Sequence, residues 1–94
     1  MTPEGKVKQK VTKLLKQYGC WYWMPVVSGY GAATLDYLCA IDGRMFGIEA
    51  KKPGAKPTPR QRATMRQMEN KNIPCFVIDG DLTELEEWLI KVTE

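Results

Sequence analysis

The dipeptide Asp42-Gly43 constrains the fold most, because it stands between two strand-like runs, residues 35–41 and 44–51. Both residues of such a dipeptide tolerate a positive φ, which a two-residue hairpin turn requires. The sequence therefore predicts an antiparallel hairpin in which Ile41 pairs with Arg44. Counting outward from the turn pairs Asp36 with Glu49, with both side chains on the same face of the sheet.

Two acidic side chains in directly opposed positions repel each other unless a positive charge lies between them. A divalent cation would remove the conflict, and carboxylate oxygens are the ligands that Mg²⁺ and Mn²⁺ prefer. Strand alternation places Lys51 on the same face as Glu49, where its ammonium could orient an attacking water or stabilise charge on a phosphate. The alternative is that Lys51 only forms an ion pair with one of the acids.

The segments on either side of the hairpin carry clear helix and strand signals. Thr2 can cap a helix that starts at Pro3 and ends near Gly19, with its apolar residues on one stripe. The aromatic and β-branched run 21–27 predicts a strand, and a flexible glycine-containing connection follows it.

After a loop with prolines and a glycine, Thr58 caps a second helix that runs to about Asn70, with Gln61 at the third helical position. Residues 75–78 predict a strand, and Asp81 with Glu84 predicts the cap of a last helix. The element order is αβββαβα. We therefore expect one α/β domain over residues 1–94, with a mixed central sheet flanked by helices.

Glu4 belongs to the apolar stripe of the first helix, because it precedes Val7 by three residues and Val11 by seven. One explanation is that Glu4 coordinates a metal ion or a water molecule. The other is that an acid in the first turn complements the helix dipole. The lysines at positions 6, 8, 10, 13 and 16 are assigned to the solvent face of this helix.

Composition excludes several kinds of chemistry. The 94 residues contain no histidine, which removes the commonest general base and any histidine ligand for zinc. The three cysteines show no paired spacing, which favours free thiols in a reducing cytoplasm. The net charge of +3 is compatible with an acidic polymer as partner. Neither a membrane-spanning segment nor a secretory signal is expected.

Asp36 is followed thirteen positions later by Glu49-Ala50-Lys51, and this pattern resembles the PD-(D/E)XK nuclease signature. Gln61, which opens the next helix, fits several branches of that group. The chain looks like a virus-type replication-repair nuclease (VRR-NUC) domain and, after that, like archaeal Holliday junction resolvases. One departure is Leu35, which stands where the pattern has proline. The resemblance implies that Glu4, Asp36, Glu49 and the carbonyl of Ala50 bind metal, that Lys51 is catalytic with Asp36 and Glu49, and that Gln61 supports the site.

Four basic side chains follow the predicted site closely, namely Lys52, Lys56, Arg60 and Arg62. They could bind DNA phosphates, or they could belong to a solvated loop. Tyr30 in the glycine loop is a further candidate for DNA contact. The three tryptophans, Trp21, Trp23 and Trp88, stand in apolar runs and are assigned to the core.

The sequence thus predicts a metal-dependent DNA endonuclease that uses Mg²⁺ or Mn²⁺. From the resemblance we expect branched or structured DNA as substrate, a homodimer, and a location in the cytoplasm of a bacterial cell or a phage-infected host. The main alternative is a non-catalytic DNA-binding or assembly module that keeps the fold. A second alternative is a structural protein whose acids face solvent, for which added Mg²⁺ would leave the melting temperature unchanged.

Overall fold

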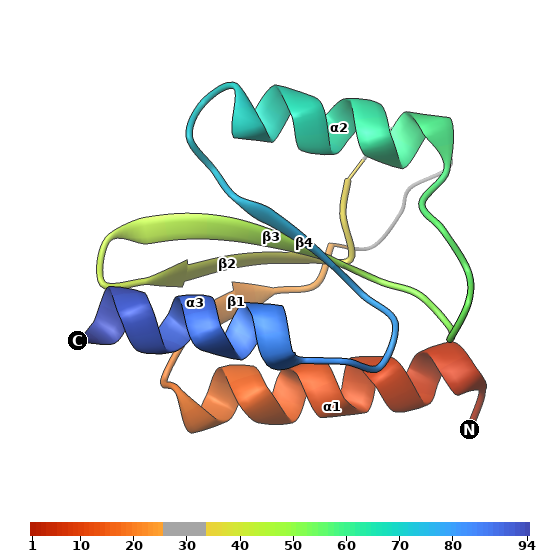
Figure 1. The fold of residues 1–94 in the computed structure, drawn as a ribbon, viewed down its shortest axis with the longest axis horizontal. Helices are drawn as coiled ribbons and strands as arrows, with labels where there is room; N and C mark the ends of the chain where they lie inside the picture. Colours follow the sequence, from red (N-terminus) through yellow and green to blue (C-terminus); the bar gives the residue numbers. More distant parts are fainter. Residues whose placement is uncertain (26–33) are drawn as a thin grey trace.

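The computed structural model describes residues 1–25 and 34–94. The elements are α1 (Pro3–Gln17), β1 (Trp21–Trp23), β2 (Tyr37–Ile41), β3 (Arg44–Ala50), α2 (Pro59–Glu69), β4 (Cys75–Ile78) and α3 (Thr83–Thr93). This order confirms the predicted αβββαβα arrangement. The sheet runs β1-β2-β3-β4, with β3 and β4 parallel and the other two pairs antiparallel. Parallel neighbours need a crossover, which α2 provides on the side of the sheet opposite α1 and α3 (Figure 1).

The β2–β3 hairpin has the predicted register. Asp42 and Gly43 adopt φ values of 49° and 78°, the left-handed conformation that the turn demands. Ile41 pairs with Arg44, and the pairing continues outward to Tyr37 and Ile48. Asp36 lies one position before β2, which places it opposite Glu49 on the same register.

One face of the sheet, here called the α1/α3 face, forms the hydrophobic core. Its strand residues are Tyr22, Tyr37, Cys39, Ile41, Phe46, Ile48, Ala50, Phe76 and Ile78, and the apolar sides of α1 and α3 pack against them. Trp88 of α3 contacts this layer, with its ring centroid 4.9 Å from that of Phe46 and 5.6 Å from that of Phe76. The assignment of Trp88 to the core is confirmed.

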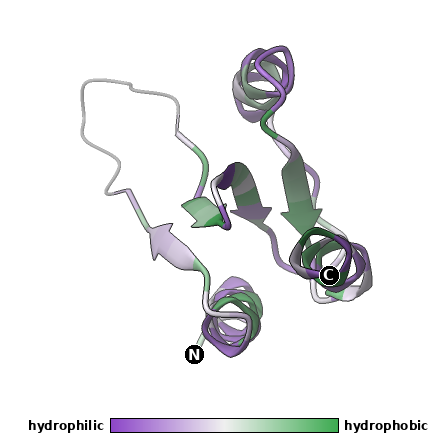
Figure 2. Ribbon diagram, turned by 90° about the vertical axis from the view of Figure 1, so that its left-hand side faces the viewer, coloured by the Kyte–Doolittle hydropathy of each residue, from purple (hydrophilic) through white to green (hydrophobic). Residues whose placement is uncertain are grey.

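The opposite face, here called the α2 face, is covered only in part. Leu35 and Met68 cover Gly47 so closely that an added Cβ would lie 2.8 Å from a side-chain carbon of each. In Figure 2, β1 lies well away from α2. Trp21 and Trp23 in β1 are 60% and 54% exposed, so their assignment to the core is wrong.

Two predicted boundaries also differ from the structure. Among the described residues, the first strand ends at Trp23. Pro25, which has no backbone N–H to donate, does not belong to the strand. Positions 26 and 27 of the predicted strand lie outside the described residues. The N-cap of α3 is Leu82 rather than Asp81. The Asp81 carboxylate instead accepts a hydrogen bond from the Thr83 N–H at 2.9 Å, a local turn that precedes the helix.

The three cysteines are free thiols, as predicted: Cys20 and Cys39 are buried and Cys75 is half-buried. Burial raises the pKa of Cys39 to about 12, so this thiol stays protonated at neutral pH. In the part of the chain that the structure describes, no helix is long and apolar enough to cross a membrane.

Candidate active site

Asp36 and Glu49 lie together where the β2–β3 ladder ends. The Ala50 N–H donates a hydrogen bond of 2.8 Å to Asp36 Oδ2, and the Asp36 N–H approaches Glu49 Oε1 at 3.3 Å. Each acid therefore accepts a hydrogen bond from the backbone of the opposite chain segment. The predicted pairing of the two carboxylates on one face is confirmed, and it depends on the turn at Gly43.

Glu49 has an unusual environment for a carboxylate. Only 3% of the residue is exposed, and it is the only polar or charged residue that is buried among those described. Burial and, to a smaller extent, the neighbouring Asp36 carboxylate together raise its pKa from 4.5 to about 7, whereas Lys51 acts in the opposite direction. A fully ionised pair at this position is therefore costly without an additional positive charge.

Lys51 extends along the same face as Glu49. Its Nζ lies 3.5 Å from Glu49 Oε2, and 13% of the side chain is exposed. The Lys51 N–H donates to the Ile78 carbonyl at 2.8 Å, which fixes the backbone just beyond β3. The ion pair of the alternative hypothesis is thus present. The Lys51 ammonium therefore stays beside the acids, where it can also contact a bound phosphate.

Gln61 links the start of α2 to the acids. Its side-chain oxygen accepts a hydrogen bond from the Thr58 N–H at 2.9 Å, while Thr58 Oγ1 accepts one from the Gln61 N–H at 3.1 Å. The amide group Nε2 then donates to Glu49 Oε2 at 2.9 Å. A glutamine satisfies both contacts because it carries an acceptor and a donor, whereas a glutamate would bring a third negative charge.

Glu4, the predicted fourth acid, is linked to the site by an ion pair with Lys8. Lys8 Nζ lies 3.6 Å from Asp36 Oδ1 and 3.9 Å from a carboxylate oxygen of Glu4. The assignment of Lys8 to the solvent face of the helix is therefore wrong, because its ammonium points into the site. The i to i+4 spacing from Glu4 to Lys8 was the available signal, since such residues are neighbours on a helix.

The donor set suits a hard divalent cation. Mg²⁺ is commonly held by one or two carboxylates together with waters and substrate phosphates, and Asp36 and Glu49 supply such a pair. Across residues 1–25 and 34–94, no group of three or more acidic, cysteine or histidine side chains is arranged to hold a metal. Metal binding by Glu4 and by the Ala50 carbonyl stays a prediction.

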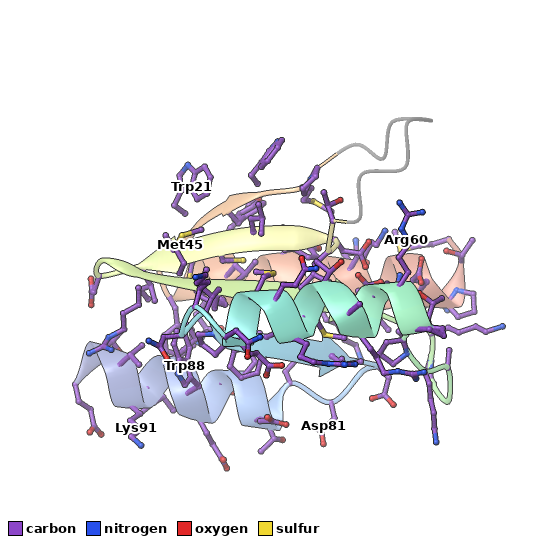
Figure 3. The ribbon with its side chains drawn as sticks, turned by 90° about the horizontal axis from the view of Figure 1, so that it is seen from above. Trp21, Met45, Arg60, Asp81, Trp88 and Lys91 are labelled. Atoms are coloured by element: carbon purple, nitrogen blue, oxygen red, sulfur yellow. The ribbon has the colours of Figure 1, made fainter. Side chains whose placement is uncertain are left out.

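The predicted DNA-contacting residues lie on the surface beside this site. The side chains of Lys52, Lys56, Arg60 and Arg62 are all exposed. Arg60 lies near the start of α2, at the opposite end of the sheet from Trp21 and Met45 (Figure 3). Arg62 donates a hydrogen bond of 3.2 Å to the Pro57 carbonyl. Tyr30 lies outside the residues that the structure describes.

The αβββαβα order, the mixed four-stranded sheet and its flanking helices define a restriction-endonuclease-like fold. A solved structure described as a "VRR_NUC domain" superposes on the chain with a TM-score of 0.77 and 22% sequence identity, covering 97% of each chain. The protein therefore has the VRR_NUC fold, as the sequence resemblance implied. No family model and no curated protein matches the sequence.

Proposed function

We propose that this protein is a metal-dependent DNA endonuclease that hydrolyses phosphodiester bonds with Mg²⁺ or Mn²⁺. The observation that carries the proposal is the buried Glu49, held beside Asp36 with Lys51 Nζ at 3.5 Å. An ionised pair of this kind is unfavourable by itself and becomes favourable when a cation binds. The VRR_NUC fold supports the same reaction class.

Each side chain has a distinct part in this reaction. A divalent ion held by Asp36 and Glu49 would supply positive charge and an acidified water at the phosphate. Gln61 keeps Glu49 in place through its 2.9 Å hydrogen bond. Lys51 stabilises the negative charge that develops on the phosphate oxygens, which is a role that a preorganised cation performs well.

The proposed substrate is branched or structured DNA, bound with help from Lys52, Lys56, Arg60 and Arg62. We also propose a homodimer, since cutting two strands of a junction calls for two active sites. The exposed apolar side chains of Trp21, Trp23 and Met45 support self-association, because soluble proteins seldom leave such a group of side chains uncovered. Light scattering of the purified chain measures the oligomeric state directly.

The test of the activity is cleavage of plasmid, linear duplex, flap and four-way junction DNA in Mg²⁺, Mn²⁺ or chelator. The unaltered protein should cleave at least one substrate, and only with metal. Glu49→Ala and Lys51→Ala should each reduce cleavage by about 10³-fold or more, as is typical when a group acting on the transition state is removed.

Matched controls come from α3, where Glu87→Ala and Lys91→Ala make the same charge changes at exposed positions away from the site. Both should cleave as the unaltered protein does. The proposal fails if all four variants cleave alike, or if no substrate is cut under any condition. DNA binding without any cleavage would instead support the non-catalytic DNA-binding module.

A further inference from the structure

A groove of about 430 Å³ lies along the side of α1 that borders Met24 and Tyr37. Among the described residues that line it, three are lysines, Lys8, Lys13 and Lys16, and none is acidic. At a rise of 1.5 Å per residue, Lys8 and Lys16 are about 12 Å apart along the helix. That separation corresponds to roughly three or four nucleotide steps of a duplex strand at 3.4 Å each.

The groove leads directly to the acids. Lys8 lines the groove and also lies 3.6 Å from Asp36 Oδ1, so one ammonium belongs to both places. Tyr37, which follows Asp36 in the chain, forms part of the groove floor. A ligand that occupies the groove therefore has one end at the candidate active site.

The floor is held in place by hydrogen bonds within the protein. The Tyr37 hydroxyl donates to the Lys8 carbonyl at 3.0 Å and lies 2.8 Å from the Thr12 hydroxyl. Tyr37 itself is fully buried. A groove that exists before binding costs little ordering when a ligand enters, and the lysines on its walls select for negative charge.

We infer that this groove binds the phosphate backbone of one nucleic-acid strand and leads that strand to Asp36. The inference rests on the proposed nuclease function and extends it, because it places the bound strand along α1 as well as near the start of α2. Since α1 and α2 lie on opposite faces of the sheet (Figure 1), the strand passes the acids between two basic surfaces.

The same helix offers a matched control. Lys6 and Lys10 carry the same charge on α1 but line a different hollow, together with Pro53 and Gly80. The two double variants to compare are therefore Lys13→Gln/Lys16→Gln and Lys6→Gln/Lys10→Gln. All four lysines are exposed, so neither change removes a buried contact, and thermal unfolding checks that both variants fold.

The measurement is fluorescence anisotropy with labelled single-stranded and duplex oligonucleotides, in chelator to prevent cleavage, over a range of salt concentrations. Lys13→Gln/Lys16→Gln should weaken binding by about tenfold at low salt. Its slope of log affinity against log salt should become shallower by about 1.4 for a single strand, which is about 0.7 for each lost phosphate contact. Lys6→Gln/Lys10→Gln should change affinity less than twofold.

Equal affinities and equal slopes for the two double variants overturn the inference, and they leave the cleavage assays to decide the nuclease function separately. A loss confined to Lys13→Gln/Lys16→Gln in a protein that cuts no DNA supports the groove while refuting the nuclease. Competition by a polyglutamate as strong as that by DNA of equal charge also overturns the inference, since the groove would then bind acidic protein. If the unaltered protein binds no nucleic acid, the groove inference fails, and the cleavage assays still decide the nuclease function.

Discussion

The α1/α3 face of the sheet stabilises the fold, whereas the α2 face carries the candidate active site. The α1/α3 face is a continuous apolar layer in which every strand residue except the exposed Arg44 contributes to the core. The α2 face carries the buried Glu49, which Gln61 of α2 contacts, and the exposed Trp21 and Trp23 of β1, which α2 leaves uncovered. Because side chains alternate along β3, the residues that stabilise the core and the residue that belongs to the candidate active site point to opposite faces of the sheet.

The sharpest test of this division compares two adjacent residues, Ile48 and Glu49. Ile48→Ala leaves a cavity in the α1/α3 face and should lower the free energy of unfolding by about 2 to 5 kcal/mol. Glu49→Gln should abolish cleavage while stabilising the metal-free protein, because burial and the neighbouring Asp36 make the ionised carboxylate unfavourable in the folded state. Chemical denaturation with cleavage assays measures both, and similar losses of stability for the two variants would contradict the division.

The pH dependence of stability should reveal Glu49 in the metal-free protein. Its pKa is raised from 4.5 to about 7 in the folded state, so the stability that the proton provides is complete below pH 4.5 and is lost as pH rises through 7. We expect the unfolding free energy to fall by about 3 kcal/mol relative to Glu49→Gln over that range. A difference between the two proteins that does not vary with pH would contradict this assignment.

Gly47 tests how tightly α2 packs on its face. A Cβ there would lie 2.8 Å from carbon atoms of Leu35 and Met68, and both belong to side chains that can adjust. Gly47→Ala should therefore cost about 1 to 3 kcal/mol in the free energy of unfolding, the usual range for overpacking. Thermal denaturation measures this cost, and an unchanged melting temperature would show that the contact is loose.

Gln61 connects the covering helix to the chemistry. Gln61→Ala removes the hydrogen bond to Glu49 and one half of the capping box, so we expect a loss of about 1 kcal/mol in stability. Weaker metal binding should accompany that loss. Thr58→Ala is the control, because it disrupts the cap without touching Glu49. Metal titrations followed by melting temperature should separate the two variants, and identical metal affinities would contradict the role of Gln61.

The smallest expected effect on folding is at β1. Trp21→Ser and Trp23→Ser alter exposed side chains, so the stability of a single chain should change by no more than about 0.5 kcal/mol. A dimer joined through these residues would dissociate at a higher protein concentration than before. Size-exclusion chromatography with light scattering measures the dissociation, and a large loss of monomer stability would contradict the exposure of these residues.

The sequence predicted the elements and the pairing of Asp36 with Glu49 because both depend on local chemistry. The turn at Gly43 sets the register, and the register alone brings the two acids together. The exposure of Trp21 could not be predicted, since it depends on where α2 crosses the sheet. The contact of Lys8 with Asp36 was missed for a related reason. A lysine on the solvent side of a helix has a side chain long enough for its ammonium to reach a neighbouring site.

The hairpin register also limits how chains of this design can vary in length. In an antiparallel pair joined by a two-residue turn, any two opposed residues are separated by an odd number of positions, and here that number is 13. Lengthening both arms by one residue each changes the separation by two and keeps the acids together. Adding a single residue between the turn and Glu49 shifts the register by one, so that the Glu49 side chain would point into the core and that of an apolar neighbour would point outward. Related active sites should therefore differ in this spacing by even steps.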